Sequence, residues 1–212
     1  MFEALLQDTF LNHSDDWEEK QIKNIGVTQT GITPHTSDKE NYGDYIPFVK
    51  PADIDIDGFG TINYINFGLS RKGLSSGRLI KKNSILMVCI GASIGKTGFS
   101  EREISCNQQI NSLTVNNDLE PKFFYYALKR RSFFDKVILN SAQATLPIIN
   151  KSKWENISVK YPKSIDEQRR IVSQFDSITA ETSVLESIYQ QKLSNLEELK
   201  KSLLQQAFSG AL

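Results

Sequence analysis

Cysteine and histidine are scarce in this 212-residue sequence, which has two residues of each. Cys89 and Cys106 are too far apart for the closely spaced thiolate ligands of a structural zinc site. Their neighbours are apolar or small, so we expect reduced thiols in a cytoplasmic protein. His13 and His35 lie in polar stretches without a pattern of catalytic or metal-binding residues. The sequence therefore predicts neither a resident metal ion nor another cofactor.

Long hydrophobic runs are missing as well. The longest, residues 85–90, is far too short to span a bilayer. The first residues have neither a basic stretch nor a long apolar stretch, so we expect no signal peptide. An apolar fraction of 39%, with 12 phenylalanines, instead predicts a folded domain that does not enter a membrane.

Motifs for catalysis are also scarce. Neither a D/N-P-P-Y/F motif nor a glycine-rich cofactor loop occurs, which excludes an amino-methyltransferase active site. The run I-G-A-S-I-G-K-T at 90–97 has three residues between its glycines, whereas a P-loop has four. We expect a tight turn there that exposes Ser93 and Lys96. The alternating Asp53, Asp55 and Asp57 fit a solvated edge better than a nuclease-like cluster.

The net charge is zero, but the charges are distributed unevenly along the chain. Residues 1–60 have 4 basic and 12 acidic side chains, and residues 171–212 have 3 and 5. Between them, residues 61–170 have 18 basic and 8 acidic side chains. A basic block of this kind suits phosphate binding, although an uneven solvated surface gives the same pattern.

The chain divides into three parts by sequence pattern. Residues 1–16 read as a short amphipathic helix over 2–11 and a polar linker. Residues 17–163 mix short β-rich runs with turn residues and predict a compact α+β domain, with one helix over 121–139 that begins at a proline. Residues 164–212 form the third part. The expected strands are 45–49, 61–67, 84–90 and 112–115.

A single long helix is predicted over 166–208, which contain neither proline nor glycine. Ser164 and Glu167 give a capping-box pattern at its start, and Gly210 follows its end. A weaker alternative is a hairpin that turns at Ser194 and Asn195. The apolar side chains recur mostly at steps of three, four and seven, the pattern of a coiled coil for dimerisation or partner docking. They are Ile171, Phe175, Ile178, Leu185, Tyr189, Leu193, Leu196, Leu199 and Leu203.

The long helix needs a second helix, because a domain of this size cannot cover the whole apolar stripe. That helix belongs either to a second chain or to a missing second half of the protein. The two ends of the chain also resemble each other, since LLQDTFLN at 5–12 matches LLQQAFSG at 203–210 in four positions. The match fits one repeat taken from a protein with two repeats.

Polar and basic side chains in the middle of the chain are candidates for DNA contacts. Residues 71–82 contain five basic and no acidic side chains, and their glycines and serines predict a flexible phosphate-binding loop. Glutamine and asparagine can read adenine, and arginine and lysine can read guanine. The candidate residues are Thr33, His35, Arg71, Lys72, Ser75, Ser76, Arg78, Ser93, Lys96, Gln143, Thr145 and Lys151.

Six motifs in order resemble those of type I restriction–modification specificity subunits. The junction I-D-E-Q-R-R-I-V at 165–172 is similar to the place where a target-recognition domain passes into a conserved-region helix. The ending LKKSLLQQAFSGAL at 199–212 resembles the end of that helix. The others are G-I-T-P at 31–34, Y-I-P-F at 45–48, S-I-L-M…G-x-x-I-G-K at 84–96 and C-N-Q-Q-I at 106–110.

The resemblance implies a non-catalytic half-subunit with one target-recognition domain and one conserved-region helix. Two copies would pair their helices antiparallel, and each domain would read one half of a bipartite, palindromic target in double-stranded DNA. The partner would be a modification subunit that holds S-adenosylmethionine and methylates adenine, with or without a translocating restriction subunit. The alternative is an oligomerisation or regulatory protein whose helix docks a partner without DNA.

Overall fold

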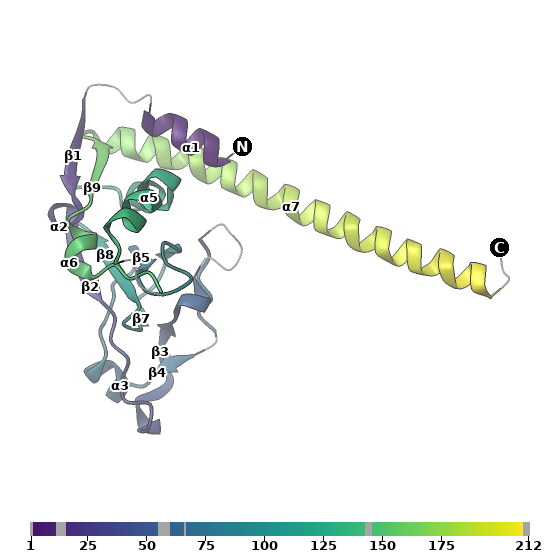
Figure 1. The fold of residues 1–212 in the computed structure, drawn as a ribbon, viewed down its shortest axis with the longest axis horizontal. Helices are drawn as coiled ribbons and strands as arrows, with labels where there is room; N and C mark the ends of the chain where they lie inside the picture. The colour runs from purple at the N-terminus through teal and green to yellow at the C-terminus, as the bar shows by residue number, and fades with distance from the viewer. Residues whose placement is uncertain (1, 12–15, 55–59, 66, 143–145, 210–212) are drawn as a thin grey trace. The chain divides into compact units, whose positions relative to one another are not determined.

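The computed structural model describes residues 2–11, 16–54, 60–65, 67–142 and 146–209. The chain forms two compact units, one of Glu3–Val172 and one of Ser173–Leu212. The first unit mixes short helices with three small sheets, and the second is helical, which confirms the α+β prediction with a long C-terminal helix (Figure 1). The domain boundaries at 16 and 163 stay a prediction. No helix in the described residues is long and apolar enough to cross a membrane.

A four-stranded antiparallel sheet forms the centre of the first unit. Its strand order is β2 (Gly26–Thr30), β8 (Ile110–Val115), β5 (Ser84–Val88) and β6 (Thr97–Ser100). All five residues of β5 are buried, because β5 lies between two neighbouring strands and is covered on both faces. The antiparallel order brings the ends of β2 and β5 and the starts of β6 and β8 to one end of the sheet.

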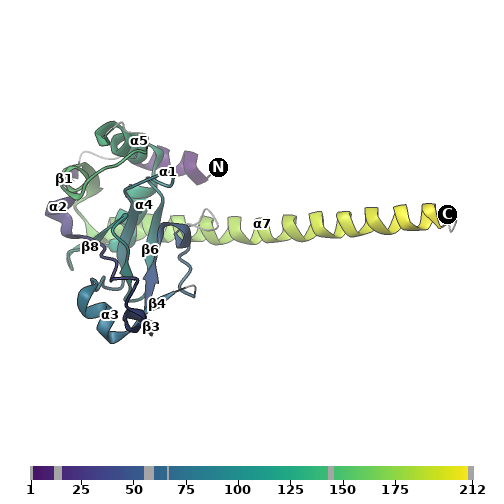
Figure 2. The same cartoon turned by 60° about the horizontal axis from the view of Figure 1, so that its bottom comes forward.

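Two smaller sheets complete the strands. β3 (Tyr42–Val49) lies between β4 (Gly68–Leu69) and β7 (Ser105–Cys106), and its pairing with β7 is parallel. β1 (Trp17–Gln21) pairs antiparallel with β9 (Ser158–Pro162), so distant parts of the chain meet. In both views, β3 and β4 lie beside the short helix α3 (Arg71–Ser76), away from α5 (Arg131–Asn140) (Figures 1 and 2). Helices of only three to five residues also occur, namely α2 (Ile22–Ile25), α6 (Lys151–Glu155), η1 (Lys39–Asn41) and η2 (Pro51–Asp53).

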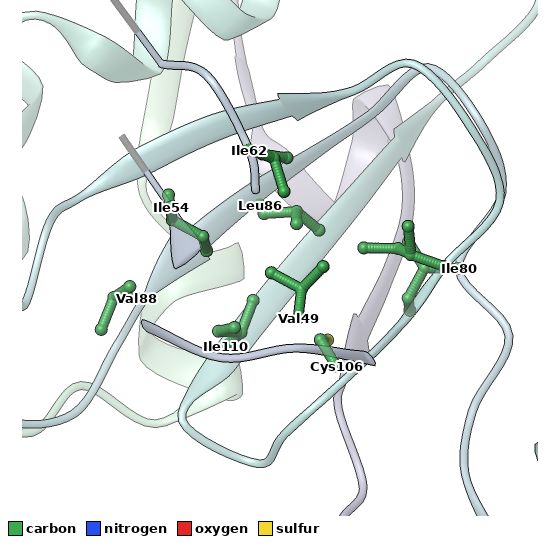
Figure 3. Packing of buried hydrophobic residues seen from close by; sticks show 9 residues of the cluster. Val49, Ile54, Ile62, Ile80, Leu86, Val88, Cys106 and Ile110 are labelled. Atoms are coloured by element: carbon green, nitrogen blue, oxygen red, sulfur yellow. The ribbon is translucent and has the colours of Figure 1, made fainter. Parts of the chain in front are cut away.

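A compact apolar cluster joins the sheets. Figure 3 shows Val49 of β3 among side chains from β5, β7 and β8. Burying this much apolar surface stabilises the unit and fixes the ends of the strands relative to one another. The cluster consists of Val49, Ile54, Ile62, Ile80, Leu86, Val88, Ile104, Cys106 and Ile110.

The prediction of a single helix over 121–139 is wrong. The structure has α4 (Pro121–Lys129) and α5 (Arg131–Asn140), separated by Arg130 in an extended conformation with ψ of 147°. The guanidinium of Arg130 donates to the carbonyl of Ala127 at 3.1 Å, and the same group lies 3.8 Å from the centre of the Phe10 ring. The break is stabilised because one side chain caps α4 and also packs against α1 (Phe2–Leu11).

The strand predicted over 61–67 is also wrong. Its described residues form only a single bridge, between Ile62 and Ile54. The side-chain oxygen of Asn63 accepts a 3.0 Å hydrogen bond from the backbone N–H of Ile65, which is a local turn that competes with a β-ladder. Ile65 is then 92% exposed, whereas Ile62 is buried. The strands expected at 45–49, 84–90 and 112–115 are confirmed as parts or extensions of β3, β5 and β8.

The long helix α7 (Ile165–Phe208) is confirmed as one continuous helix of 44 residues. The hydroxyl of Ser164 accepts from the backbone N–H of Glu167 at 3.4 Å, as the capping pattern predicts. The carboxylate of Glu167, however, accepts two 2.7 Å hydrogen bonds from Arg170. Buried Gln168 accepts from the N–H of Glu120 and donates to the carbonyl of Pro162, so it anchors the start of α7.

Candidate nucleic-acid interface

Polar loops gather at the end of the four-stranded sheet where β2 and β5 finish. We call this region the polar end of the sheet; it comprises residues 31–33, 89–96 and 107–109. The N–H of Gly31 donates to the carbonyl of Ile110 at 3.0 Å, and the N–H of Cys89 donates to the carbonyl of Gln109 at 2.7 Å. These bonds hold close together three loops that are distant in the sequence.

Three consecutive amide side chains lie in the middle of the polar end. The Thr33 hydroxyl donates to the side-chain carbonyl of exposed Gln108 at 2.5 Å. The side-chain amide of Asn107 donates to the side-chain oxygen of Gln109 at 2.9 Å. These bonds orient the amides without using the donors of Gln108, and amide groups of this kind can read base edges. The candidate list from sequence omitted Asn107, Gln108 and Gln109, although the N-Q-Q run was visible.

The run at 90–97 is a turn between two strands, not a P-loop, as the glycine spacing indicated. The N–H of Ile94 donates to the carbonyl of Gly91 at 3.0 Å, and β6 follows directly where a P-loop has a helix. Gly91 and Gly95 have φ of 95° and 87°, which favours glycine. Ser93 and Lys96 are partly exposed, and the ammonium of Lys96 donates to the carbonyl of Ile54 at 3.5 Å.

Lys50 is a second cation beside the amides and was absent from the candidates. It follows Val49, whose carbonyl accepts from the N–H of Asn107 at 3.2 Å. Its ammonium lies 4.0 Å from the centre of the Phe67 ring, while its side chain is exposed. Lys50 and Lys96 therefore add positive charge to this part of the molecule, which suits a polyanion.

The predicted loop at 71–82 is partly helical. Ser70 caps α3 by accepting from the N–H of Gly73 at 3.1 Å, so the first half is ordered. The hydroxyls of Ser75 and Ser76 donate back to carbonyls of the same helix. Exposed Arg71 stacks on Tyr45, 4.8 Å from its ring centre. The flexible loop predicted here is a helix in its first half, because the Ser70 cap offsets the low helix propensity of glycine and serine in α3.

Lys72 is neutralised by carboxylates of the chain. Its ammonium lies 2.9 Å from Asp38 and 2.6 Å from Glu40. The hydrogen bonds that Lys72 donates to Glu40 and Asp38 raise the pKa of Lys72, and the bond from Lys72 lowers the pKa of Asp38. All three groups are on the surface, so the pairs are weak and a phosphate can compete with them.

Arg78 and His35 hold the segment before β3. The guanidinium of Arg78 donates to the carbonyl of Thr30 at 3.0 Å, beside the polar end. The carbonyl of His35 accepts from the side chain of buried Asn41 at 3.1 Å, and its imidazole is exposed. The structure thus brings Thr33, Ser93, Lys96 and Arg78 to one end of the sheet, and His35 follows Thr33 by two residues, whereas α3 lies beside β3 and β4.

Lys151 is apart from this group. Its ammonium lies 2.5 Å from the Glu155 carboxylate and 3.3 Å from the Thr28 hydroxyl, in the middle of β2. Burial alone would raise the pKa of Glu155, but the hydrogen bonds from Lys151 and Thr28 lower it overall. Lys151 therefore already has an anionic partner in α6, and its contact with DNA stays a prediction.

Two further candidates, Gln143 and Thr145, lie outside the described residues, but the segments on either side of them are placed. The N–H of Ala142 donates to the carbonyl of Ile148 at 2.8 Å, and the N–H of Gly91 donates to the carbonyl of Pro147 at 3.1 Å. Ala142, Pro147 and Ile148 therefore lie beside the polar end.

Acidic and thiol groups give no catalytic cluster in the described part of the chain. Buried Asp53 accepts from the N–H of Lys50 at 2.9 Å, and Asp55 and Asp57 lie outside the described residues, as does His13. Among described residues, no group of three histidine, cysteine or acidic side chains could hold a metal ion. Burial raises the pKa of both Cys89 and Cys106 to about 12, so neither is a reactive thiolate.

Comparisons with known proteins give one consistent result. Residues 14–195 match the family "Type I restriction modification DNA specificity domain". The HindI specificity subunit of Haemophilus influenzae is 31% identical over 188 residues, 86% of this chain and 39% of that protein. The MjaIX specificity subunit of Methanocaldococcus jannaschii is 26% identical over 167 residues, 77% and 38% of the two chains.

Solved structures share the fold. A chain from a study of assembly and conformational transition in the type I R-M system matches 98% of this chain at 20% identity, with a TM-score of 0.76. The HsdS subunit of Thermoanaerobacter tengcongensis matches all of it at 19% identity, with a TM-score of 0.69. This chain spans about two fifths of the curated relatives and half of either solved chain.

Proposed function

The chain belongs to the type I restriction modification DNA specificity domain family, and we propose that it recognises a DNA sequence for a partner adenine methyltransferase. The observation that supports this most directly is the polar end of the sheet, where Thr33 orients the amide of Gln108 and Asn107 bonds to Gln109. Phosphate contacts would position the domain, and the amides and neighbouring loops would read bases in the major groove. Recognition alone needs no catalytic group in this chain.

The partner modification subunit would hold S-adenosylmethionine and carry out methylation, and a restriction subunit would join where cleavage occurs. The relatives' names support this assignment, since each is a specificity subunit of a type I restriction enzyme. A cytoplasmic location fits two buried, unpaired cysteines.

We further propose a homodimer formed through α7. From Val184 onward, the large apolar side chains of this helix are 45–88% exposed. A contiguous apolar surface of this kind is unfavourable in water and is typical of an interaction site. A symmetric pair would present two recognition domains and would favour a bipartite, palindromic target. The candidates Ile171 and Phe175 are buried and Ile178 is half-buried, so the exposed stripe comprises Leu185, Tyr189, Leu193, Leu196, Leu199 and Leu203.

The exposed face of α7 also favours a second candidate, an oligomerisation or regulatory protein that does not bind DNA. The two functions are separated by DNA binding with the modification subunit present. Recognition predicts a sequence preference that weakens when Gln108 is changed and an affinity that falls when Lys50 is changed. The regulatory protein predicts that Arg71→Ala, Lys72→Ala and Lys50→Ala leave DNA affinity unchanged.

A further inference from the structure

Phe67 is an exposed aromatic residue that the fold holds in place. Its backbone carbonyl accepts from the N–H of Phe48 in β3 at 2.9 Å, which fixes the residue beside that strand. Its ring packs against the ring of Tyr42, with 5.1 Å between the ring centres. Phe48 is 2% exposed, whereas Phe67 is 42% exposed. A large part of an immobilised apolar side chain is therefore open to solvent.

A chain of contacts through Tyr42 joins Phe67 to the amides of the polar end. The hydroxyl of Tyr42 donates to the backbone carbonyl of Pro34 at 2.9 Å. Pro34 directly follows Thr33, whose hydroxyl donates to the side-chain carbonyl of Gln108. The ring that packs on Phe67 is thus tied to the same loop that orients the Gln108 amide.

A second chain of contacts runs through Lys50. The ammonium of Lys50 lies 4.0 Å from the centre of the Phe67 ring. Lys50 directly follows Val49, whose carbonyl accepts from the N–H of Asn107 at 3.2 Å. An apolar ring, a cation and the run of amides are therefore joined to one another by two separate routes.

These three kinds of group match what an A·T base pair presents in the major groove. Adenine presents N7 and N6, which the amide of Gln108 can read, and thymine presents a C5-methyl group, which an apolar side chain contacts. The methyl group lies on the side of the thymine nearest its own backbone. A cation 4.0 Å from the contacting ring can therefore reach a phosphate of the same strand.

We propose that Phe67 forms a subsite for the 5-methyl group of a thymine in the target, with Lys50 on a phosphate of the same strand. This inference rests on the proposed DNA recognition and names one base that the target contains. The thymine belongs to the base pair that Gln108 reads or to the pair next to it. Phe67 then contributes specificity, because cytosine has a hydrogen where thymine has the methyl group, whereas Lys50 contributes affinity for any sequence.

Replacement of thymine by deoxyuridine tests the subsite without any change to the protein. The full-length chain, with the modification subunit present, is bound to its preferred DNA with each thymine replaced in turn. We expect one position in each half-site where uracil lowers the affinity about fourfold, the loss that corresponds to one buried methyl group. At that position, 5-methylcytosine should bind about fourfold tighter than cytosine, because the contact is to the methyl group and not to the thymine O4.

Variants assign the contact to Phe67. Phe67→Ala should bind thymine and uracil equally at the sensitive position. Tyr45→Ala is the matched control, since Tyr45 is also an exposed aromatic, 52% exposed and with Arg71 stacked on its ring, and it should keep the fourfold ratio. Lys50→Ala should lower affinity for both DNAs and leave their ratio unchanged.

Photochemical cross-linking of the native chain gives the same assignment if Phe67→Ala does not fold. 5-Iododeoxyuridine carries iodine where thymine carries its methyl group, and on irradiation it links to an aromatic ring that it touches. We expect the cross-linked peptide to carry the DNA at Phe67, and a link only at another residue would place the subsite elsewhere.

The outcomes separate this inference from the proposed function. Binding with a clear sequence preference, but with equal affinity for thymine and uracil at every position, overturns the methyl subsite and leaves DNA recognition standing. A fourfold ratio that survives Phe67→Ala, or that is lost in Tyr45→Ala, also overturns it. Binding without preference for any sequence overturns the proposed function itself.

Discussion

The hydroxyl of Thr33 donates a 2.5 Å hydrogen bond to the side-chain carbonyl of Gln108, 75 residues further along the chain. The bond holds the Gln108 amide in one orientation and leaves its NH2 group to donate elsewhere. Because Thr33 follows β2 and Gln108 precedes β8, the sheet itself sets their separation. This pair defines the centre of the polar end.

Gln108→Ala should reduce discrimination at one base pair by about 1–3 kcal/mol, since a good amide–base contact is worth that much. The measurement is binding of preferred and single-mismatch DNA in the presence of the modification subunit. Asn117→Ala, beyond the other end of β8, is the matched control. Equal discrimination by the Gln108 variant and the native chain would remove Gln108 from base reading.

Lys50→Ala and Lys96→Ala should weaken binding to all DNA sequences alike. Each removes one phosphate contact, so the slope of log affinity against log salt should fall by about 0.9 per lysine. Lys81→Ala and Lys82→Ala are the controls, because these exposed lysines precede the opposite end of β5. Slopes that change only in the control variants would place the phosphate contacts elsewhere.

Gly95→Ala should destabilise the first unit by about 1–3 kcal/mol, because a non-glycine residue at φ of 87° is strained. An added Cβ would also overlap the ring of Phe134. Gly43→Ala is the control, since an added Cβ there meets atoms only at 3.5 Å and beyond. Urea unfolding of both variants gives the comparison, and equal stability would contradict the turn geometry.

Glu155→Gln should destabilise the protein by about 1 kcal/mol at pH 7, because the charged carboxylate accepts from Lys151 and Thr28. The pKa of Glu155 is lowered in the folded state, so its contribution is present above its ordinary value of 4.5 and is lost as pH falls below it. The difference in free energy of unfolding between the native chain and the variant should therefore shrink between about pH 5 and pH 3, where carboxylates ordinarily become protonated. Glu103→Gln is the exposed control, and a difference independent of pH would contradict the ion pair.

Local signals predicted the elements that depend on local interactions. The α7 helix follows from a long stretch without proline or glycine and from Ser164 at its start. The short helix over 2–11 and three of four expected strands also follow from periodicity. The turn at Gly91–Gly95 was predictable because the glycine spacing does not fit a P-loop.

Features that depend on distant residues could not be predicted. The pairing of β1 with β9 joins residues 17–21 to 158–162, and neither strand has a distinctive pattern. Arg130 breaks a helix because of its contacts with Ala127 and Phe10, which sequence alone does not place nearby. The prediction of the candidate site has the same limit. Sequence alone does not show that Lys72 and Lys151 are paired with carboxylates. It also does not show that the sheet places Gln108 beside Thr33.

Selection of bound DNA from a random pool, with the modification subunit present, tests the central claim most directly. We predict enrichment of two short elements at a fixed spacing, related by a two-fold axis, and loss of this enrichment with Gln108→Ala. Binding without any sequence preference, at low and at physiological salt, would contradict DNA recognition by this chain.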